Sequence, residues 1–479
     1  MSKAHGIFIG GEWHDGVGTE PNVNPSDTRD IVGDYAQADA SHVAAAVSAA
    51  RAAFPSWSAT TPQQRSEILD RAGTELLARS AELGRLLSRE EGKTLPEGVG
   101  EVTRAGQLFK FFAAEAVRLS GTMGASTRPG IGIEVTREPV GVFGLITPWN
   151  FPIAIPAWKL APALAFGNCV VLKPSEFTPA CAVVLVEILA KAGLPAGVLN
   201  LVNGPGHVVG QALVASSGVD GISFTGSVAT GRGIAQAAAA RMARVQCEMG
   251  GKNPLVVLDD ADLDVAVNCA LNGAFFSTGQ RCTASSRLVV TPGIHDRFVS
   301  RLVERLRALK VDHALKDGTE MGPAIHEAQL EKDLRYVGIA TSEGATLACG
   351  GERLQRDTPG WYLSPALLTD TTNGSRINRE EVFGPVASVI RVRDYDEALA
   401  VSNDTEFGLC AGLCTTSLKH ATHFRRAAQA GLVMINLPTA GLDYHLPFGG
   451  RKASSYGPRE QGEAAREFYT QGKTAYVSA

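Results

Sequence analysis

One cysteine stands in a context suited to covalent chemistry. Cys282 ends the polar segment Phe-Ser-Thr-Gly-Gln-Arg-Cys, and Glu248 lies upstream of it, directly before a Met-Gly-Gly-Lys segment. The thiolate is the attacking form of cysteine, and a carboxylate can later draw a proton from water. Because covalent oxidation of a carbonyl compound needs such a pair, we expect the chain to be an enzyme.

A third candidate group follows a predicted strand. Asn150 lies in Thr-Pro-Trp-Asn-Phe-Pro (147–152), and the two prolines rigidify the segment that presents it. An amide N–H is the kind of donor that stabilises an oxyanion. A lone asparagine in a turn more commonly satisfies the local backbone, so the motif by itself leaves both interpretations open.

Two further strand ends carry groups that could hold a nucleotide. Gly226 and Ser227 join a predicted strand to a helix, where glycine admits close approach and a helix N-terminus attracts phosphate. Lys173 and Glu176 follow another strand, where they could contact ribose hydroxyls. The alternatives are a tight turn and a solvated turn, and neither motif decides alone, since the usual G-x-G-x-x-G pattern is absent.

The elements that must position these groups alternate between strand and helix. Residues 1–100 are predicted to be mainly helical, with one helix starting at Thr61-Pro62 and running to about 87, and a second at about 97–119. Further helices are expected at about 156–166, 178–192, 206–216 and 228–240. Predicted strands occupy 142–147, 169–172, 198–202, 221–224, 245–248, 255–258, 287–290, 387–391, 409–415 and 432–436.

This alternation favours an α/β fold with mainly parallel sheets covered on both faces. Ligands of such sheets bind at the carboxyl ends of the strands, which is where the candidate groups stand. The strands before residue 250 would form a nucleotide-binding half, and those after it would form a half that contains the cysteine.

Composition excludes several classes of protein. The 479 residues suggest two or three domains at roughly 150 residues each. The net charge is −4 and the sequence contains no run of Lys or Arg, so it offers no basic cluster that would bind nucleic acid or an anionic membrane. The first residues lack an apolar signal segment, and no stretch reaches roughly 18 uninterrupted apolar residues. We therefore expect a cytoplasmic protein whose partners are small molecules or protein subunits.

The eight cysteines are scattered through a large chain, so we expect reduced thiols. Cys410 and Cys414 form the only close pair. No His or Cys pair at zinc spacing accompanies them, and we predict no metal site.

The order of the motifs carries more information than any one of them. Seven motifs together resemble the aldehyde dehydrogenase superfamily over essentially the whole chain. They are Pro-Trp-Asn (148–150), Lys-Pro-Ser-Glu (173–176), Phe-Thr-Gly-Ser (224–227), Glu-Met-Gly-Gly-Lys-Asn-Pro (248–254), Gly-Gln-Arg-Cys (279–282), Glu-Glu-Val-Phe-Gly-Pro (380–385) and Pro-Phe-Gly-Gly (447–450).

The resemblance implies a Rossmann-like NAD-binding domain, an α/β catalytic domain and a small β oligomerisation arm. Matched to this sequence, the first comprises 1–119 and 140–250, the second 251–452, and the arm 120–139 and 453–479. It also implies a homodimer or a homotetramer.

Carried over position by position, the resemblance makes Cys282 the nucleophile that attacks an aldehyde. The oxyanion would be held by the Asn150 side chain and the Cys282 N–H, hydride would pass to a nicotinamide, and Glu248 would activate water to hydrolyse the thioester. The product would be a carboxylic acid.

The implied cofactor is NAD, with NADP possible, because a carboxylate at Glu176 would repel a 2′-phosphate. Lys173 and Glu176 match residues that hold the adenine ribose, and Gly226 and Ser227 match residues at the pyrophosphate. The implied cofactor-binding residues are Thr147, Trp149, Lys173, Ser175, Glu176, Phe224, Gly226, Ser227, Gly250, Glu381 and Phe383.

The substrate is less constrained. The segment 436–462 resembles 2-oxoglutarate semialdehyde (2,5-dioxopentanoate) dehydrogenases, and Arg281 could grip a substrate carboxylate bidentately. Alternatively, Arg281 faces solvent or another subunit. Succinate semialdehyde dehydrogenases resemble this chain less here, because they place arginines where it has Trp158 and Phe276. The candidate substrate residues are Phe151, Trp158, Phe276, Arg281, Leu442 and Phe448.

Other substrates and activities stay open at this stage. Succinate semialdehyde or a neutral aliphatic or aromatic aldehyde could occupy an apolar tunnel. Transfer of the thioester to coenzyme A and a catalytically silent structural or binding role are both disfavoured, because Glu248 supplies a hydrolytic base beside an intact Cys282 and Asn150.

Overall fold

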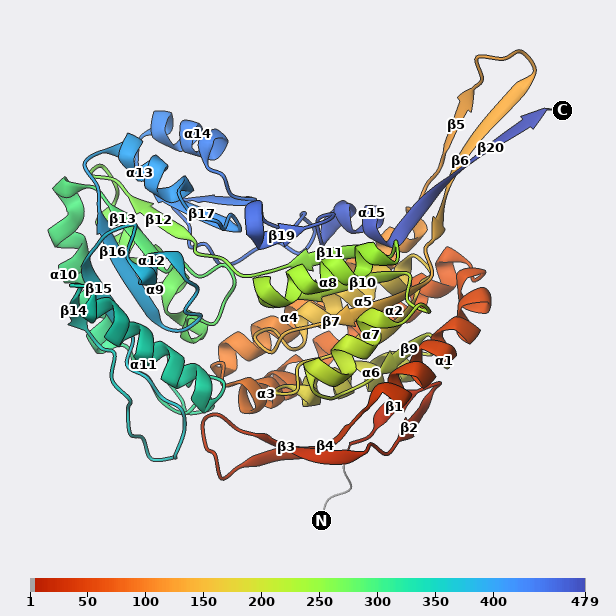
Figure 1. Ribbon diagram of the computed structural model, residues 1–479, viewed down its shortest axis with the longest axis horizontal. Helices are drawn as coiled ribbons and strands as arrows, with labels where there is room; N and C mark the ends of the chain where they lie inside the picture. Colours follow the sequence, from red (N-terminus) through yellow and green to blue (C-terminus); the bar gives the residue numbers. More distant parts are fainter. Residues whose placement is uncertain (1–4, 479) are drawn as a thin grey trace.

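The computed structural model describes residues 5–478, so residues 1–4 and 479, which the predicted domains include, lie outside the described part. Two large sheets dominate the molecule, and a narrow three-stranded ribbon projects from it (Figure 1). The expected α/β architecture with Rossmann-like, largely parallel sheets is confirmed.

The first sheet has the order β19-β11-β10-β7-β8-β9-β1-β2. Its five central strands are parallel, and the three others are antiparallel additions at its edges. The central strands are β7 (Val142–Ile146), β8 (Cys169–Lys173), β9 (Leu199–Leu201), β10 (Gly221–Thr225) and β11 (Arg244–Glu248). All five predicted strands of this half are therefore present.

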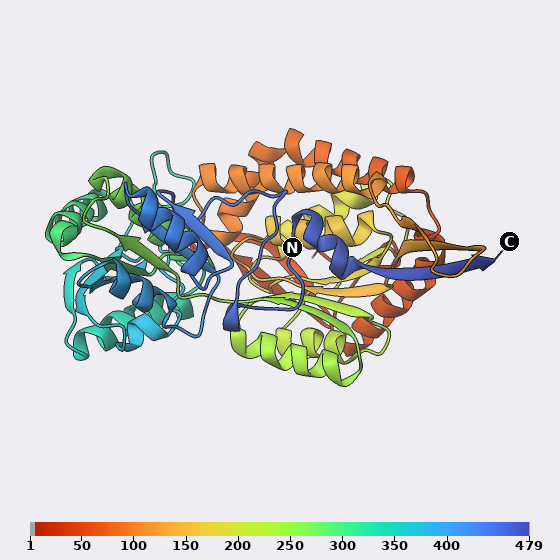
Figure 2. The same cartoon turned by 90° about the horizontal axis from the view of Figure 1, so that it is seen from above.

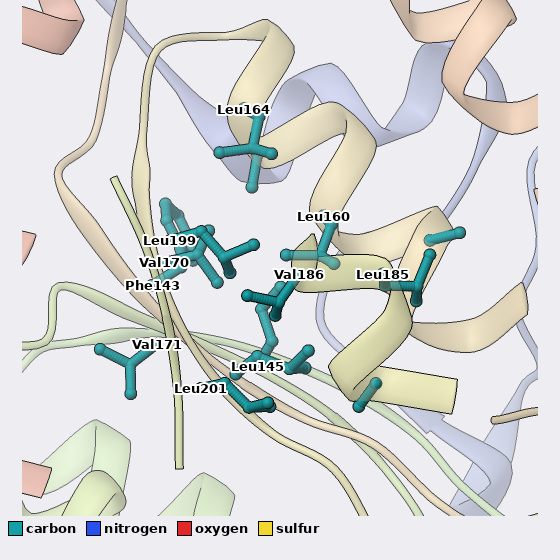
Figure 3. Close-up of a cluster of buried hydrophobic side chains, with 14 of the residues drawn as sticks. Phe143, Leu145, Leu160, Leu164, Val170, Val171, Leu185, Val186, Leu199 and Leu201 are labelled. Atoms are coloured by element: carbon teal, nitrogen blue, oxygen red, sulfur yellow. The ribbon is translucent and has the colours of Figure 1, made fainter. Parts of the chain in front are cut away.

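Helices cover both faces of this sheet (Figure 2). They include α5 (Ala154–Ala165), α6 (Pro179–Lys191), a π-helical turn at Gly206–Gly210 that leads into α7 (Gln211–Ala215), and α8 (Val228–Ala240). Leu160 and Leu164 of α5 and Val186 of α6 pack toward Phe143 and Leu145 of β7 in a fully buried core (Figure 3). The continuous apolar runs of the strands are explained by this burial on both faces.

The N-terminal region departs from the prediction. Residues 7–37 form strands: β1 (Ile7–Ile9), β2 (Glu12–His14), β3 (Gly18–Val23) and β4 (Ile31–Gln37). The predicted helices follow, but the first is broken at Arg79 into α2 (Pro62–Ala78) and α3 (Ser80–Glu91). They are preceded by α1 (Ala40–Ser58) and followed by α4 (Leu95–Val117).

Local capping fixes where these helices begin. Asp39, Thr61 and Thr94 each form a capping box, in which the cap side chain and the side chain three residues later satisfy free backbone N–H groups. The Thr94 box uses Oε2 of Glu97, so the first turn of α4 presents the other carboxylate oxygen to a neighbouring element.

The second sheet has the order β14-β15-β16-β13-β12-β17-β18 and is parallel except for β14. Its strands are β12 (Pro254–Val257), β13 (Arg287–Val290), β14 (Thr346–Cys349), β15 (Ala366–Thr371), β16 (Val386–Arg391), β17 (Cys410–Cys414) and β18 (Leu432–Ile435). The five predicted strands are present, and β14 and β15 were not predicted. Covering helices are α9 (Leu263–Ala274), α10 (Pro292–Ala308), α11 (Glu327–Ser342), α13 (Tyr395–Asn403) and α14 (Leu418–Ala427).

The projecting ribbon joins distant parts of the chain. β20 (Thr470–Ser478) pairs antiparallel with β6 (Ile131–Pro139), and β6 pairs with β5 (Thr122–Ala125) (Figure 1). Residues 455–469 pack instead on the first sheet, where β19 (Ser455–Tyr456) pairs with β11 and Phe468 is buried in the core. The division into three domains stays a prediction.

None of the helices within residues 5–478 combines the length and apolar character needed to cross a membrane.

Candidate active site

The parallel strands of the first sheet bring four predicted motifs to one edge. Ile146 is in register with Lys173, and Thr225 with Glu248, so the carboxyl ends of β7, β8, β10 and β11 align. Asn150 follows β7 directly. The expectation that these groups gather at the carboxyl edge is met in the geometry, because parallel register forces it.

Cys282 lies in the connection between α9 and β13. The turn Phe276–Gly279 precedes it, and Ser277 and Thr278 adopt left-handed conformations with φ of 52° and 56°. The carbonyl oxygen of Cys282 accepts a hydrogen bond from Asn253 Nδ2 at 2.8 Å. Left-handed backbone is costly for residues other than glycine, so this turn stores strain beside the thiol.

The Asn150 amide is aimed at the same turn. Its Nδ2 donates to the carbonyl oxygen of Gln280 at 3.0 Å, two residues before Cys282. The main-chain oxygen of Asn150 accepts from Lys93 Nζ, and Lys93 also pairs with Glu101 at 2.8 Å. One N–H of the Asn150 side chain thus fixes its orientation, and the second is available for another acceptor.

Glu248 is buried at the end of β11. Its Oε2 accepts from Ser455 Oγ at 2.5 Å, whereas its Oε1 has no partner among the described residues. Burial, and then the nearby charge of Glu460, raises the pKa of the Glu248 carboxyl well above its usual range. Gly449 lies so close that a Cβ there would stand 2.7 Å from Oε1, which explains the glycine.

Burial raises the pKa of the Cys282 thiol to about 12, and the carboxylates of Glu381 and Glu248 add to the shift. Both carboxylates disfavour a second negative charge nearby. In this arrangement the raised pKa favours the protonated thiol.

A cavity of about 570 Å³ opens on Cys282. Trp158 and Phe448 form part of its apolar wall with ring centroids 5.4 Å apart, and Phe151 and Leu442 also line it. Phe276 is not among its lining residues and packs against the core of the second sheet instead. The cavity thus collects five of the six predicted substrate residues, including Arg281.

Arg281 is already engaged by neighbouring groups. Its Nη2 donates to Ser277 Oγ at 2.8 Å and to Glu97 Oε1 at 3.2 Å, and its Nη1 contacts the backbone and side chain of Asn272. Glu97 Oε1 also accepts from the Ser277 N–H at 2.8 Å. The guanidinium therefore ties the strained turn to α4.

The predicted nucleotide residues lie along the carboxyl edge of the first sheet. Lys173 Nζ stands 3.8 Å from Glu176 Oε2, and burial lowers the Lys173 pKa. Ser227 caps α8 by accepting from the Thr230 N–H. Two hydroxyls of this edge, Thr147 Oγ1 and Thr225 Oγ1, are buried without a partner in the described chain.

The remaining predicted residues come from around the second sheet. Glu381 Oε1 accepts from the Gly251 N–H at 2.8 Å, and a Cβ on Gly250 would lie 2.3 Å from the same carboxylate. Phe383 has a φ of 67°, and its ring packs edge-on against Trp149 with centroids 5.4 Å apart. Ser175, Phe224 and Gly226 lie near the same edge as Lys173 and Ser227, with a Cβ on Gly226 meeting the Phe224 ring at 2.5 Å.

Sequence reasoning missed several charged residues of the site. Glu97, Glu101 and Arg104 line the cavity from one face of α4, and Lys159 and Glu460 form a buried ion pair that reaches Ser223. The spacing of 97, 101 and 104 inside a predicted helix was a usable signal, because residues three and four apart share a helix face. Glu460 gave no such signal, since its partner is distant in sequence.

The fold and this site define an aldehyde dehydrogenase. Residues 13–475 match the model of the aldehyde dehydrogenase family, and the chain belongs to that family. Its members oxidise aldehydes, which makes the chain an enzyme with a small-molecule aldehyde as substrate.

Individual relatives are similar over nearly their full length. An "alpha-ketoglutaric semialdehyde dehydrogenase" of Bacillus subtilis is 44% identical, covering 98% of this chain and 97% of that protein. A "2,5-dioxopentanoate dehydrogenase" of Saccharolobus solfataricus is 41% identical over 97% of this chain and 98% of that protein. The crystal structure of a Staphylococcus aureus betaine aldehyde dehydrogenase in complex with NAD+ has a TM-score of 0.97 at 34% identity, covering 100% of this chain and 95% of that one.

Proposed function

We propose that this protein is an NAD-dependent dehydrogenase that oxidises 2-oxoglutarate semialdehyde (2,5-dioxopentanoate) to 2-oxoglutarate. The names of the two similar dehydrogenases support this substrate. The observation that carries the proposal is a cavity in which an apolar wall and guanidinium groups surround the Cys282 thiol, since an acidic semialdehyde combines a short carbon chain with a carboxylate.

The carboxyl edge of the first sheet fits a dinucleotide. The unpartnered hydroxyls of Thr147 and Thr225 need a polar ligand, and the N-terminus of α8 beside Gly226 and Ser227 suits a pyrophosphate. Lys173 and Glu176 would hold the adenine ribose, with Ser175 and Phe224 beside them, and Glu176 disfavours a 2′-phosphate. Trp149, Gly250, Glu381 and Phe383 would surround the nicotinamide end. Bound there, the nicotinamide accepts the hydride that leaves the aldehyde carbon.

Cys282 loses its thiol proton to solvent and attacks the aldehyde carbon as the thiolate. The negative charge that develops on the oxygen is stabilised by the second N–H of Asn150 Nδ2 and by the Cys282 backbone N–H, because preorganised donors lower the energy of a developing oxyanion. Loss of hydride from the thiohemiacetal leaves a thioester on Cys282 Sγ.

Glu248 then acts as the general base. Its free Oε1 takes a proton from water, the hydroxide attacks the thioester carbonyl, and the acid leaves as Cys282 is regenerated. A raised pKa makes the ionised Glu248 a stronger base than an ordinary carboxylate. The presence of this base favours hydrolysis over transfer to coenzyme A.

The proposal extends to the organisation of the molecule. Residues 1–119 and 140–250 would form the NAD-binding domain and 251–452 the catalytic domain, with 120–139 and 453–479 forming an oligomerisation arm. The assembly would be a homodimer or a homotetramer in the cytoplasm.

A substrate panel tests this function. NADH or NADPH formation is followed with 2,5-dioxopentanoate, succinate semialdehyde, pentanal and benzaldehyde, each with NAD and with NADP and each with and without coenzyme A. We expect the highest kcat/KM with 2,5-dioxopentanoate and NAD, and no dependence on coenzyme A. A higher kcat/KM for succinate semialdehyde or a neutral aldehyde would overturn the proposed substrate.

Replacing the nucleophile tests the mechanism. Cys282→Ala should lower acid formation by at least about 10⁴-fold, because no thioester can form. Cys349→Ala removes a thiol of β14 outside the cavity and serves as the matched control, with full activity expected. Turnover retained by Cys282→Ala would refute covalent catalysis at this position.

A further inference from the structure

Arg104 presents the most unusual charge of the cavity. It projects from α4 into the space in front of Cys282. Its Nη1 donates to the main-chain oxygen of Leu442, and its Nη2 donates to Gln461 Oε1 at a long 3.4 Å. Its Nε is buried without any partner in the described chain. A buried donor without an acceptor is costly, so an arginine in this state needs an acceptor that the chain does not supply.

The other charges that line the cavity are paired. Lys93 pairs with Glu101 at 2.8 Å, and Arg281 pairs with Glu97 at 3.2 Å. No carboxylate of residues 5–478 lies within ion-pair distance of Arg104. The charges of the two ion pairs cancel, so the positive charge of Arg104 is the one that remains in the cavity.

Two carboxyl groups attract Arg104 through space without pairing with it. Glu101 is already engaged by Lys93 at 2.8 Å. Asp443 attracts Arg104 through space, but it is exposed and forms no ion pair with it, so solvent screens the attraction.

We propose that Arg104 is the residue that binds the carboxylate of the substrate and so selects acidic aldehydes. This inference rests on the proposed function and assigns its specificity to a residue other than Arg281. A guanidinium presents several N–H groups in a plane that matches a carboxylate, and it does so strongly when water is excluded. The apolar wall of Trp158, Phe448 and Leu442 excludes water on the substrate's carbon chain.

Arg281 then has a different task. Its guanidinium neutralises Glu97 and holds Ser277, so it supports the strained turn that presents Cys282. Loss of Arg281 should disturb the oxidation of every aldehyde, whereas loss of Arg104 should disturb acidic aldehydes alone.

The test compares variants on two substrates of equal carbon number. For Arg104→Gln, KM for 2,5-dioxopentanoate should rise about 10- to 100-fold, as expected for the loss of a charged hydrogen bond, while KM for pentanal should change less than about twofold. Arg104→Lys keeps the charge and should recover part of the loss. Arg118→Gln, at the exposed end of the same helix, is the matched control and should behave as wild type. Arg281→Gln should lower kcat for both substrates.

Inhibition by glutarate measures the same contact without turnover of an acidic aldehyde. Glutarate should inhibit pentanal oxidation competitively in the wild type, and Arg104→Gln should raise its inhibition constant about 10-fold or more. Equal effects of Arg104→Gln on acidic and neutral aldehydes, or unchanged glutarate inhibition, would overturn the role of Arg104. Poor wild-type turnover of 2,5-dioxopentanoate with intact, Arg104-dependent glutarate inhibition would instead refute only the proposed substrate.

Discussion

At the scale of single residues, Glu248 couples the chemistry to pH. Its carboxyl must be ionised to accept a proton from water, yet burial and the charge of Glu460 raise its pKa well above 4.5. A base with a raised pKa loses activity as pH falls through that raised value, so hydrolysis of the thioester should decline at a higher pH than an ordinary glutamate would allow.

Glu460→Gln should shift the decline of thioester hydrolysis at acidic pH, called here the acidic limb of the profile, to lower pH. The substitution removes a negative charge near Glu248 and leaves Lys159 without its counter-charge, so the local charge becomes more positive and favours the ionised form of Glu248. The measurement is the pH dependence of thioester hydrolysis in single turnovers. The exposed Glu463→Gln is the control. An unchanged limb in Glu460→Gln would show that Glu248 does not sense Glu460.

Glu460→Gln should also lower the melting temperature, because it leaves Lys159 buried without its counter-charge. Breaking one side of a buried ion pair typically costs about 3–5 kcal/mol. The pH dependence of hydrolysis and the melting temperature are therefore two independent measurements of the role of Glu460.

Residue identities could be predicted from sequence wherever short motifs carry them. Cys282, Asn150 and Glu248 were found in this way and lie beside one cavity or sheet edge. Arg104 could not be found, because its significance depends on which neighbouring charges are paired, and those pairs join residues far apart in the chain. Arg281 was predicted to bind substrate from its position alone, whereas its partners Glu97 and Ser277 became visible only in the fold.

At the scale of elements, α4 and the turn at 276–279 are held together by hydrogen bonds to Glu97. Glu97, in the first turn of α4, accepts hydrogen bonds from the backbone and hydroxyl of Ser277 and from Arg281. Left-handed Ser277 and Thr278 each carry strain of about 1–3 kcal/mol, which these contacts offset.

Glu97→Ala should release the turn and lower kcat about 10-fold or more for acidic and neutral aldehydes alike, because a small displacement of a nucleophile reduces its rate strongly. Glu97→Gln keeps an acceptor for Ser277 and should be intermediate. Glu115→Gln, near the other end of α4, is the control. A loss restricted to acidic aldehydes would show that Glu97 acts on substrate charge and not on the turn.

Burial alone does not explain which elements were predictable, because β1 is fully buried and most of β15 is buried, yet neither was predicted. The central strands of both sheets were found because they are apolar runs buried on two faces. β2 is exposed throughout and most of β3 is exposed, so neither carries an apolar pattern. Arg79 interrupts a helical periodicity that continues on either side, which is why one helix was predicted where α2 and α3 exist.

At the scale of the whole molecule, the two sheets cooperate at the cavity. The cavity is lined by residues of α4 and α5, which cover the first sheet. Cys282, Met434 of β18 and residues of the loop after β18, up to Leu442, add to the lining from the second sheet. Neither half supplies both the nucleophile and the base, because Cys282 precedes β13 and Glu248 ends β11. Catalysis therefore depends on the junction between the halves.

The projecting ribbon is the feature of the molecule that most needs a partner. Tyr476 of β20 lies directly opposite Ile133 of β6, so their side chains share one face of the ribbon. Ile131 and Val135 are two residues before and after Ile133 and therefore point to the same face. Tyr476 is 60% exposed in the single chain. Exposed apolar side chains on a ribbon that extends from the body are typical of a subunit contact.

Tyr476→Glu combined with Ile133→Glu should therefore convert the proposed oligomer into smaller species. Two carboxylates buried side by side in the contact cost several kcal/mol, which is enough to shift association at micromolar concentration. Light scattering coupled to size-exclusion chromatography gives the mass, and circular dichroism checks that each subunit stays folded. Ala475→Glu is the control, because it places a negative charge on the other face of β20. If the apolar face is the contact, Ala475→Glu should keep the mass of the wild type. If the double variant keeps the mass of the wild type, the apolar face of the ribbon is not the contact, and the assembly must form through the body of the molecule.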